Sequence, residues 1–253
     1  MRRIIFYALA FVMAAVCVRL GLWQLSRLSE RRASNRVVEA RLDSAVTPFA
    51  AVPRDTALAR YRRVTLDGVY DHAHELLIVG RSRNGSPGVN LFTPLRVDGS
   101  DTAVLVNRGW VYAPDAMTVA DPERWREPGP VRITGFVQTF HPDGPGGSAL
   151  ADRPAALRRT DPDAIRARLP YPIAPVYVVA LQTEGDSARG APDSLPARLA
   201  APALDEGSHL GYAFQWFTFA TIAIAGSGVM WWQERRRRGG AAELRAPAAT
   251  RGA

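Results

Sequence analysis

The chain contains no lysine, so all 32 of its basic residues are arginines. This absence excludes a Walker-type phosphate loop and a lysine Schiff base, because both depend on the lysine amine. Cys17 is the single cysteine, which excludes an internal disulfide framework and any metal or redox motif built on paired cysteines. The sequence also lacks the Gly-x-Ser-x-Gly elbow of serine hydrolases. With no catalytic constellation in view, we expect that the protein is not an enzyme.

The charge balance is basic, with a formal net charge of +8 over 253 residues. Such a surplus is typical of proteins that bind nucleic acid or anionic membranes. The densest basic run, Arg235–Arg238, follows an apolar stretch closely, so we expect a lipid bilayer and no nucleic acid as partner. The arginine-only, alanine-rich composition is typical of GC-rich coding and indicates a bacterium, with the cell inner membrane as the location.

An uncharged stretch near the end of the sequence, Leu210–Trp232, predicts a transmembrane helix. At about 1.5 Å of rise per residue, such a helix crosses roughly 30 Å of hydrocarbon. Trp231 and Trp232 are typical of an interfacial aromatic belt, and the arginines behind them are costly to translocate. We therefore expect residues 209–232 to span the membrane and residues 233–253 to form a basic, disordered cytoplasmic tail.

Another apolar stretch, Ile4–Val18, follows the basic start of the chain. One interpretation is a signal peptide, but no small-x-small cleavage site follows the apolar run. We favour a retained helix from Ile4 to about Trp23, in which Arg19 snorkels toward the interface. Residues 1–25 then form a cytoplasmic start and the first transmembrane helix.

The arginines around the two helices give opposing signals for orientation. Positions 27, 31, 32 and 36 after the first helix are arginines, which taken alone would place that side in the cytoplasm. The second helix has the stronger asymmetry, because Asp205 and Glu206 precede it and Arg235–Arg238 follow it. Two spans place both termini on one side of the membrane. We expect both termini in the cytoplasm and residues 26–208 outside it.

The stretch between the two spans has the pattern of a mostly β domain. Short apolar or alternating runs predict buried strands, and Gly- and Pro-rich segments such as Asn84–Gly88 and Ala113–Pro130 predict the turns between them. The predicted strands are Val64–Leu66, Leu76–Val79, Val104–Val106, Val131–Ile133 and Val176–Leu181.

The sequence also predicts two helices and a linker between the two spans. Ser26–Leu42 predicts a charged helix, and Pro162–Leu169 predicts a short one, with Asp161 as N-cap and Pro170 as the stop. Glu184–Pro202 is expected to be a linker to the second span. The expected fold class is a membrane protein, with two transmembrane helices flanking a mostly β (α+β) extracytoplasmic domain.

Two closely spaced histidines in the domain have two interpretations. His72 and His74 are two residues apart, and alternate positions on a strand point the same way, so they would share a metal. The other interpretation is a solvated turn between two strands, which we favour because two ligands do not define a site. His141 is expected to be a loop residue. Asp143–Gly147 lacks the strand and helix that flank a phosphate loop.

The second span begins with a group of side chains that merits a functional interpretation. Steps of three and four residues place them on one face of the helix. An imidazole beside aromatic rings and small residues suits a flat aromatic ligand with an iron centre. Residue types alone favour the alternative, which is anchoring at the lipid headgroups. The group consists of His209, Tyr212, Ala213, Trp216 and Ala220.

Four stretches of the sequence form a recognisable pattern when taken in order. They are Gly21–Leu28, Tyr61–Tyr70, the segments within Pro87–Val111 that include Thr93–Leu95 and Val106–Val111, and His209–Phe217. Together they make the sequence resemble the Surfeit-locus family of cytochrome c oxidase assembly proteins, over nearly all of the chain except its tail. The poorest match is Ala113–Leu157. The family often has paired asparagines before its second-helix histidine, whereas Gly207 and Ser208 stand here.

The resemblance implies a role in maturing haem-copper oxidase, with transient binding of haem A. The histidine implicated in the family matches His209, which would ligate the haem iron. Trp23 and Gln24 end the first span at the same membrane face, and Trp23, Tyr212 and Trp216 would pack the macrocycle. The implied partners are the catalytic subunit of cytochrome c oxidase and, as a further candidate, haem A synthase. The alternative is a scaffold that stabilises an oxidase subunit intermediate without binding a cofactor.

Overall fold

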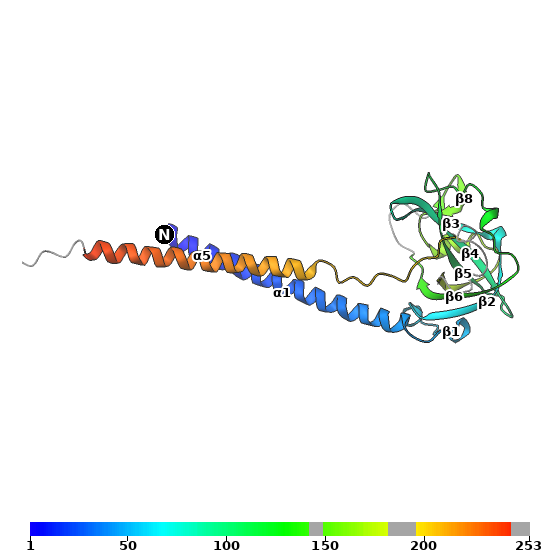
Figure 1. Ribbon diagram of the computed structural model, residues 1–253, viewed down its shortest axis with the longest axis horizontal. Coiled ribbons are helices and arrows are strands. Elements are labelled where there is room, and N and C mark those ends of the chain that lie inside the picture. Colours follow the sequence, from blue (N-terminus) through cyan, green and yellow to red (C-terminus); the bar gives the residue numbers. More distant parts are fainter. Residues whose placement is uncertain (142–148, 182–195, 244–253) are drawn as a thin grey trace, which may run out of the picture. The chain divides into compact units, whose positions relative to one another are not determined.

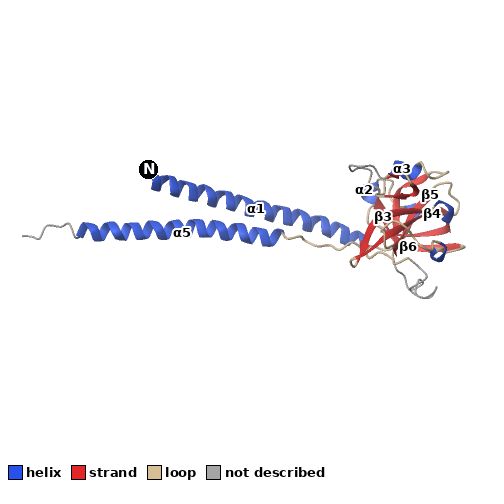
Figure 2. Ribbon diagram, turned by 90° about the horizontal axis from the view of Figure 1, so that it is seen from above, coloured by secondary structure: helices blue, strands red, loops and turns tan. Residues whose placement is uncertain are grey.

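The computed structural model describes residues 1–141, 149–181 and 196–243. The chain divides into two compact units. The first is a helical unit of Met1–Val37 and Leu204–Ala253, and the second is a β domain of Val38–Ala203. Figure 1 shows the two long helices of the first unit and the strands of the second, and Figure 2 distinguishes helices from strands by colour.

Two long helices dominate the first unit. Helix α1 runs without a break from Arg2 to Leu42, so the predicted span and the predicted charged helix after it are one element. Helix α5 runs from His209 to Glu243, and residues 233–243 of the predicted tail are therefore helical; the rest of the tail lies outside the described residues. Both helices are long and apolar enough to cross a membrane, by length and composition. Their orientation stays a prediction.

The seam between α1 and α5 contains several small residues. Shielded positions on α1 recur at alternating steps of three and four, which is the spacing of a helix–helix interface. A Cβ atom on Gly21 would lie 2.8 Å from the Phe217 ring, so glycine permits this close approach. The seam residues are Ala14, Cys17, Gly21, Gln24 and Leu28 on α1, and His209, Ala213, Trp216 and Ala220 on α5.

Five strands of the second unit close into a barrel. Each is hydrogen-bonded to two neighbours in the order β2-β6-β9-β5-β4, and β4 returns to β2 through the pairing of Gly68 with Val97. The β5–β9 pair is parallel and the other four pairs are antiparallel. The strands are β2 (Arg63–Tyr70), β4 (Ser86–Val97), β5 (Ala103–Tyr112), β6 (Pro130–Thr139) and β9 (Ile173–Ala180).

Short elements extend the barrel. Strand β3 (Leu76–Arg83) pairs with β4, and β8 and β7 continue the sheet beyond it, while β1 pairs with β2 at the other edge. The remaining elements are β1 (Thr47–Pro48), β7 (Ala149–Leu150), β8 (Arg153–Leu157), α2 (Thr56–Ala59), α3 (Pro162–Arg166) and three 3-10 turns: η1 (Phe49–Ala51), η2 (His72–His74) and η3 (Glu123–Trp125).

Alternate residues of the five strands fill the barrel interior. Side chains of successive strand residues point to opposite faces, so one set lines the inside and the other the outside. Gly68 and Gly135 allow the strands to approach closely, because a Cβ at either position would lie 2.2 Å and 2.3 Å, respectively, from a carbonyl oxygen of the neighbouring strand. The inner core includes Val64, Leu66, Leu95, Val104, Val106, Ile133, Val137, Val176 and Val178.

A second apolar cluster covers part of the outer face of the barrel. Phe92 of β4, Leu105 of β5 and Tyr177 of β9 contribute to it from the barrel wall. Ile165 of α3 and Leu157 of β8 pack against them from outside. Burial of these side chains attaches the short helix and the outer strands to the barrel.

The structure confirms most of the predicted elements and corrects some boundaries. All five predicted strands are present, although β9 ends before Leu181, and Asp161 caps α3 by accepting from Asp163 N and Ala164 N. Helix α3 ends at Arg166, three residues earlier than predicted. The longest strand, β4, was not predicted and begins at Ser86 inside the predicted turn, because its Pro and Gly residues resemble a loop.

Candidate functional site

The sequence-predicted site centres on His209, the first residue of α5. Its Nδ1 lies 2.8 Å from Oε1 of Gln24, which comes from the shielded face of α1. An amide oxygen accepts hydrogen bonds, so Nδ1 carries the proton in this pair. In the neutral ring, Nε2 then keeps its lone pair, which is the form of imidazole that binds a metal. Gln24 therefore contacts the histidine and orients it.

The aromatic residues predicted for the site differ in how exposed they are. Tyr212 is 49% exposed and Trp23 is 51% exposed, so both rings have free faces. Trp216 is half-buried and meets Phe219 edge-on, with ring centroids 6.0 Å apart. These rings are available to pack against a ligand or lipid at this end of the helices.

The two alanines predicted for the same face serve another purpose. Ala213 is 1% exposed and Ala220 is 3% exposed, and both lie in the seam with α1. The predicted surface therefore divides: the alanines pack between the helices, while Tyr212 projects outward. Spacing places side chains on one face of a helix, but it does not show how much of that face a neighbour covers.

A loop before α5 is attached to α1 by charged and polar contacts. Arg32 makes two hydrogen bonds to the Glu206 carboxylate, both 2.8 Å long. Arg31 and Asn35 each donate to the carbonyl oxygen of Asp205, at 3.2 Å and 3.0 Å. A bidentate guanidinium–carboxylate pair fixes geometry as well as distance. These contacts hold the start of α5, and thus the histidine, against α1.

A cleft of about 450 Å³ adjoins the histidine. Gly207, which lines this cleft, has a φ of 70°, a conformation that favours glycine. A Cβ at this position would lie 3.6 Å from Nε2 of His209, which is ordinary contact. The lining residues are Arg27, Glu30, Arg31, Ser34, Asp205, Glu206, Gly207 and His209.

A buried ion network in the β domain was not predicted from the sequence. Arg108 on β5 has no exposed surface, and its Nη1 lies 2.8 Å from Oε2 of Glu75. Its Nε and Nη2 lie 3.0 Å and 2.9 Å from Oε1 of Glu127, and Nη2 also donates to the carbonyl oxygen of Trp125. Arg198 donates to the other oxygen of Glu127 at 3.1 Å and to the carbonyl oxygen of Arg108 at 2.6 Å.

This network corrects the predicted linker. Residues 196–202 pack on the domain, because Ala197 pairs with Trp110 and Arg198 is buried among the ions. The earlier part of the predicted linker lies outside the described residues. No single spacing in the sequence indicates this network, since its charges come from four separate segments.

The histidine pair of the domain occupies the turn η2 between two strands, as the favoured interpretation predicted. The turn is less solvated than expected, because the His72 side chain is only 13% exposed. His72 Nε2 accepts from Glu127 N at 3.2 Å, and His74 Nδ1 lies 2.8 Å from Asp71. His141 follows β6 outside any strand, as predicted. Within the described residues, no three His, Cys, Asp or Glu side chains group as metal ligands.

Comparison with known proteins gives one family. The model of the SURF1 family matches residues 11–221. Relatives include the "Cytochrome oxidase assembly protein SHY1" of Saccharomyces cerevisiae, 32% identical over 43% of this chain and 29% of that protein. Others are a "SURF1-like protein" of Monosiga brevicollis, 30% identical over 47% of this chain and 49% of that protein, and one of Rickettsia conorii, 30% identical over 40% and 42%. The matches thus span less than half of these relatives.

Proposed function

Because the chain belongs to the SURF1 family, we propose that it is an assembly factor for cytochrome oxidase and not an enzyme. The observation that carries this proposal is the extent of the family match, which includes the β domain and the facing parts of both long helices. The proposed partner is the catalytic subunit of the oxidase, with haem A synthase as a second candidate.

The proposed location is a bacterial inner membrane that both helices cross. Two apolar helices of sufficient length support this location. Arginines 235–238 near the end of α5 support a cytoplasmic position for both termini. The β domain would then face the outer side of the membrane, where residues 26–208 were predicted to lie.

Haem A is the proposed cargo at the outer end of the helix pair. The donor set fits a haem ligand, because Gln24 Oε1 accepts a hydrogen bond from Nδ1 of His209, and in the neutral ring Nε2 then carries the lone pair that would bind iron. Bound haem would supply the redox-active iron that the oxidase needs. His209 would hold the iron at Nε2, Gln24 would orient the ring, and Trp23, Tyr212 and Trp216 would shield the macrocycle from water.

The first experiment tests the assembly role. Deleting the gene should lower the cytochrome oxidase activity of membranes and the amount of assembled oxidase, and the wild-type gene should restore both. Oxidase assembly that is unchanged in the deletion strain would contradict the proposal.

A second experiment tests the ligand. The protein is purified from cells that produce haem A, and its absorbance spectrum is recorded. His209→Ala should accumulate normally but lose the haem spectrum, whereas the control His74→Ala, in the β domain, should keep it. Gln24→Leu should weaken haem retention by about 10–100-fold, the range for a residue that orients a metal-bound histidine. A full haem spectrum from His209→Ala would refute the assignment of His209 as the haem-iron ligand.

The alternative is a scaffold that binds an oxidase subunit without haem. It predicts that wild-type protein carries no haem and that His209→Ala still supports oxidase assembly. The same two measurements, haem content and oxidase assembly, therefore separate the alternatives.

A further inference from the structure

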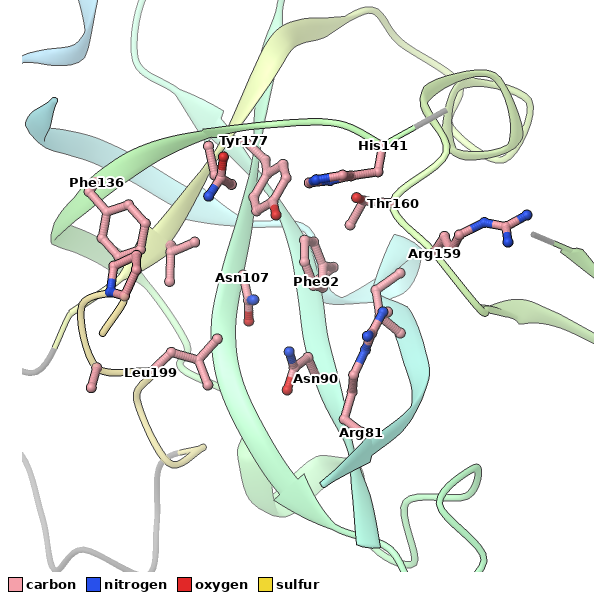
Figure 3. Close-up of a pocket in the computed structure, with 15 residues that line it drawn as sticks. Arg81, Asn90, Phe92, Asn107, Phe136, His141, Arg159, Thr160, Tyr177 and Leu199 are labelled. Atoms are coloured by element: carbon pink, nitrogen blue, oxygen red, sulfur yellow. The ribbon is translucent and has the colours of Figure 1, made fainter. Parts of the chain in front are cut away.

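A cavity of about 540 Å³ lies on the outer face of the barrel wall. Its volume falls within the range of small-molecule sites. Outward-facing side chains of four neighbouring barrel strands, β6, β9, β5 and β4, form the wall, and residues 199–202 form another side. Figure 3 shows the lining side chains. All of its described lining residues belong to the β domain, and the inference does not rest on haem binding by His209.

The cavity presents hydrogen-bond donors without competing acids. Among the described residues that line it, none is an aspartate or glutamate. Asn90 of β4 and Asn107 of β5 lie near each other in Figure 3. Asn107 uses its Oδ1 to accept from Gly109 N at 3.1 Å, which leaves its amide nitrogen for a ligand. Within the described part of the chain, the Asn90 side chain has no hydrogen-bond partner that would compete.

Arg81 is the cation that faces these amides. A β-bulge between Ile78 and Arg81 shifts the register of β3, and such a bulge re-aims the side chain that follows it. Arg81 donates from Nη2 to the carbonyl oxygen of Arg158 at 3.1 Å, but its buried Nε has no partner in the described structure. The guanidinium of Arg159 extends away from the other labelled side chains in Figure 3.

Burial makes this guanidinium costly without an anion. Loss of water around Arg81 lowers the pKa of its guanidinium below the usual value. No salt bridge to a described residue offsets that cost. An oxyanion at Nε would satisfy the unpaired donor and the charge together, since guanidinium matches carboxylate and phosphate geometry.

Aromatic side chains supply the other half of the site. Phe92 and Tyr177 meet edge-on with centroids 5.2 Å apart, and Phe136 lines the same cavity. Burial raises the pKa of Tyr177 to about 12, so its hydroxyl stays protonated and uncharged near an anion. A wall of this kind favours a flat, apolar body over a hydrated inorganic ion.

We propose that this cavity binds a small oxyanion, a carboxylate or phosphate, that is attached to a planar apolar body. The oxyanion would sit between Arg81, Asn90 and Asn107, and the body would rest against Phe92 and Tyr177. Because carboxylate and phosphate share this chemistry, the experiment uses both.

The test is isothermal titration calorimetry on the full-length protein in detergent micelles. The probes are benzoate, phenyl phosphate, inorganic phosphate and benzamide, the uncharged analogue of benzoate. We expect at least one of the two aromatic anions, benzoate or phenyl phosphate, to bind. If benzoate binds, benzamide should bind at least about tenfold more weakly than benzoate. If phenyl phosphate binds, inorganic phosphate should bind more weakly than phenyl phosphate. The anion that binds identifies carboxylate or phosphate as the preferred group.

Variants locate the site. Arg81→Gln should weaken binding of the aromatic anion by about tenfold or more, because a charged hydrogen-bond donor is lost. Arg83→Gln is the matched control, since Arg83 lies two residues further along β3 and is exposed. It removes the same charge and should leave the affinity within about twofold. Should Arg81→Gln fail to fold by circular dichroism, Asn90→Ala replaces it and should weaken binding.

Three results would overturn the proposal. The first is that neither aromatic anion binds at millimolar concentration. The second is that benzamide or inorganic phosphate binds as well as the corresponding aromatic anion. The third is equal loss of affinity in Arg81→Gln and Arg83→Gln, which would show a nonspecific charge effect.

Discussion

Removing the Glu127 carboxylate should destabilise the β domain strongly. The side chains of Arg108 and Arg198 are 0% and 5% exposed, and both donate to Glu127. In Glu127→Ala, the two buried guanidiniums would share the one remaining carboxylate of the network, Glu75. Breaking a buried pair by removing one partner costs about 3–5 kcal/mol, because it leaves a buried charge uncompensated.

A surface pair provides the control. Arg132 and Asp67 also form a two-bonded pair, at 2.6 Å and 3.1 Å, but their side chains are 72% and 50% exposed. Exposed pairs contribute only about 0.2–1 kcal/mol. Asp67→Ala therefore deletes a comparable ion pair with a much smaller expected loss.

Thermal unfolding of the full-length protein in micelles measures the difference. For a domain of this size, about 1 kcal/mol shifts the midpoint by about 2–4 °C. Glu127→Ala should then lower the midpoint by at least about 6 °C and Asp67→Ala by less than about 4 °C, followed by near-ultraviolet circular dichroism. Similar shifts in the two variants would refute the reasoning that burial decides the cost.

Two further predictions concern the ion network of the β domain, and a third concerns the seam between α1 and α5. Burial opposes ionisation of Glu75, but His72, the charge of Arg108 and hydrogen bonds from Thr93 and Arg108 outweigh it and lower its pKa. The ionised Glu75 therefore stabilises the folded domain fully above its ordinary pKa of 4.5, and this stabilisation is lost as the pH falls through the lower pKa of the folded state. Glu75→Gln should then make the midpoint of thermal unfolding depend less on pH. Arg108→Lys should lower the midpoint although charge is kept, because an ammonium lacks the planar fork that reaches both carboxylates. Gly21→Leu should disturb the seam and so speed maleimide labelling of the buried Cys17. The control Gly226→Leu should not, because a Cβ at that position meets nothing within 4 Å. Equal labelling rates in the two variants would contradict close packing of α1 against α5 at Gly21.

Local patterns were enough to predict much of the fold. Strands such as Val64–Leu66 and Val131–Ile133 alternate apolar and polar residues, and that period reports a half-buried strand directly. The start of α3 was equally local, because Asp161 caps the helix through contacts two and three residues away. Such signals need no knowledge of which segments pair.

Features that depend on pairing between distant segments were not predictable. Strand β4 contains Gly88 and Pro94, which weaken its strand signal, yet β3, β5 and β2 supply its partners. The closure of the barrel rests on one such pairing, between β2 and β4. Likewise, Arg108 meets Glu127 only because the register of β5 and the path of the loop before β6 bring them together.

The candidate site shows where the two kinds of information meet. Spacing predicted that His209 and Ala213 share a face of the second helix, and this is a local property. The alternating spacing from Ala14 to Leu28 was also present in the first helix, but spacing alone does not say which helix covers which face. Only the packed pair brings Gln24 to 2.8 Å from the imidazole. In the neutral ring, that contact places the proton on Nδ1 and leaves the lone pair on Nε2, which is what the proposed ligand role requires; the ligand role itself stays a proposal.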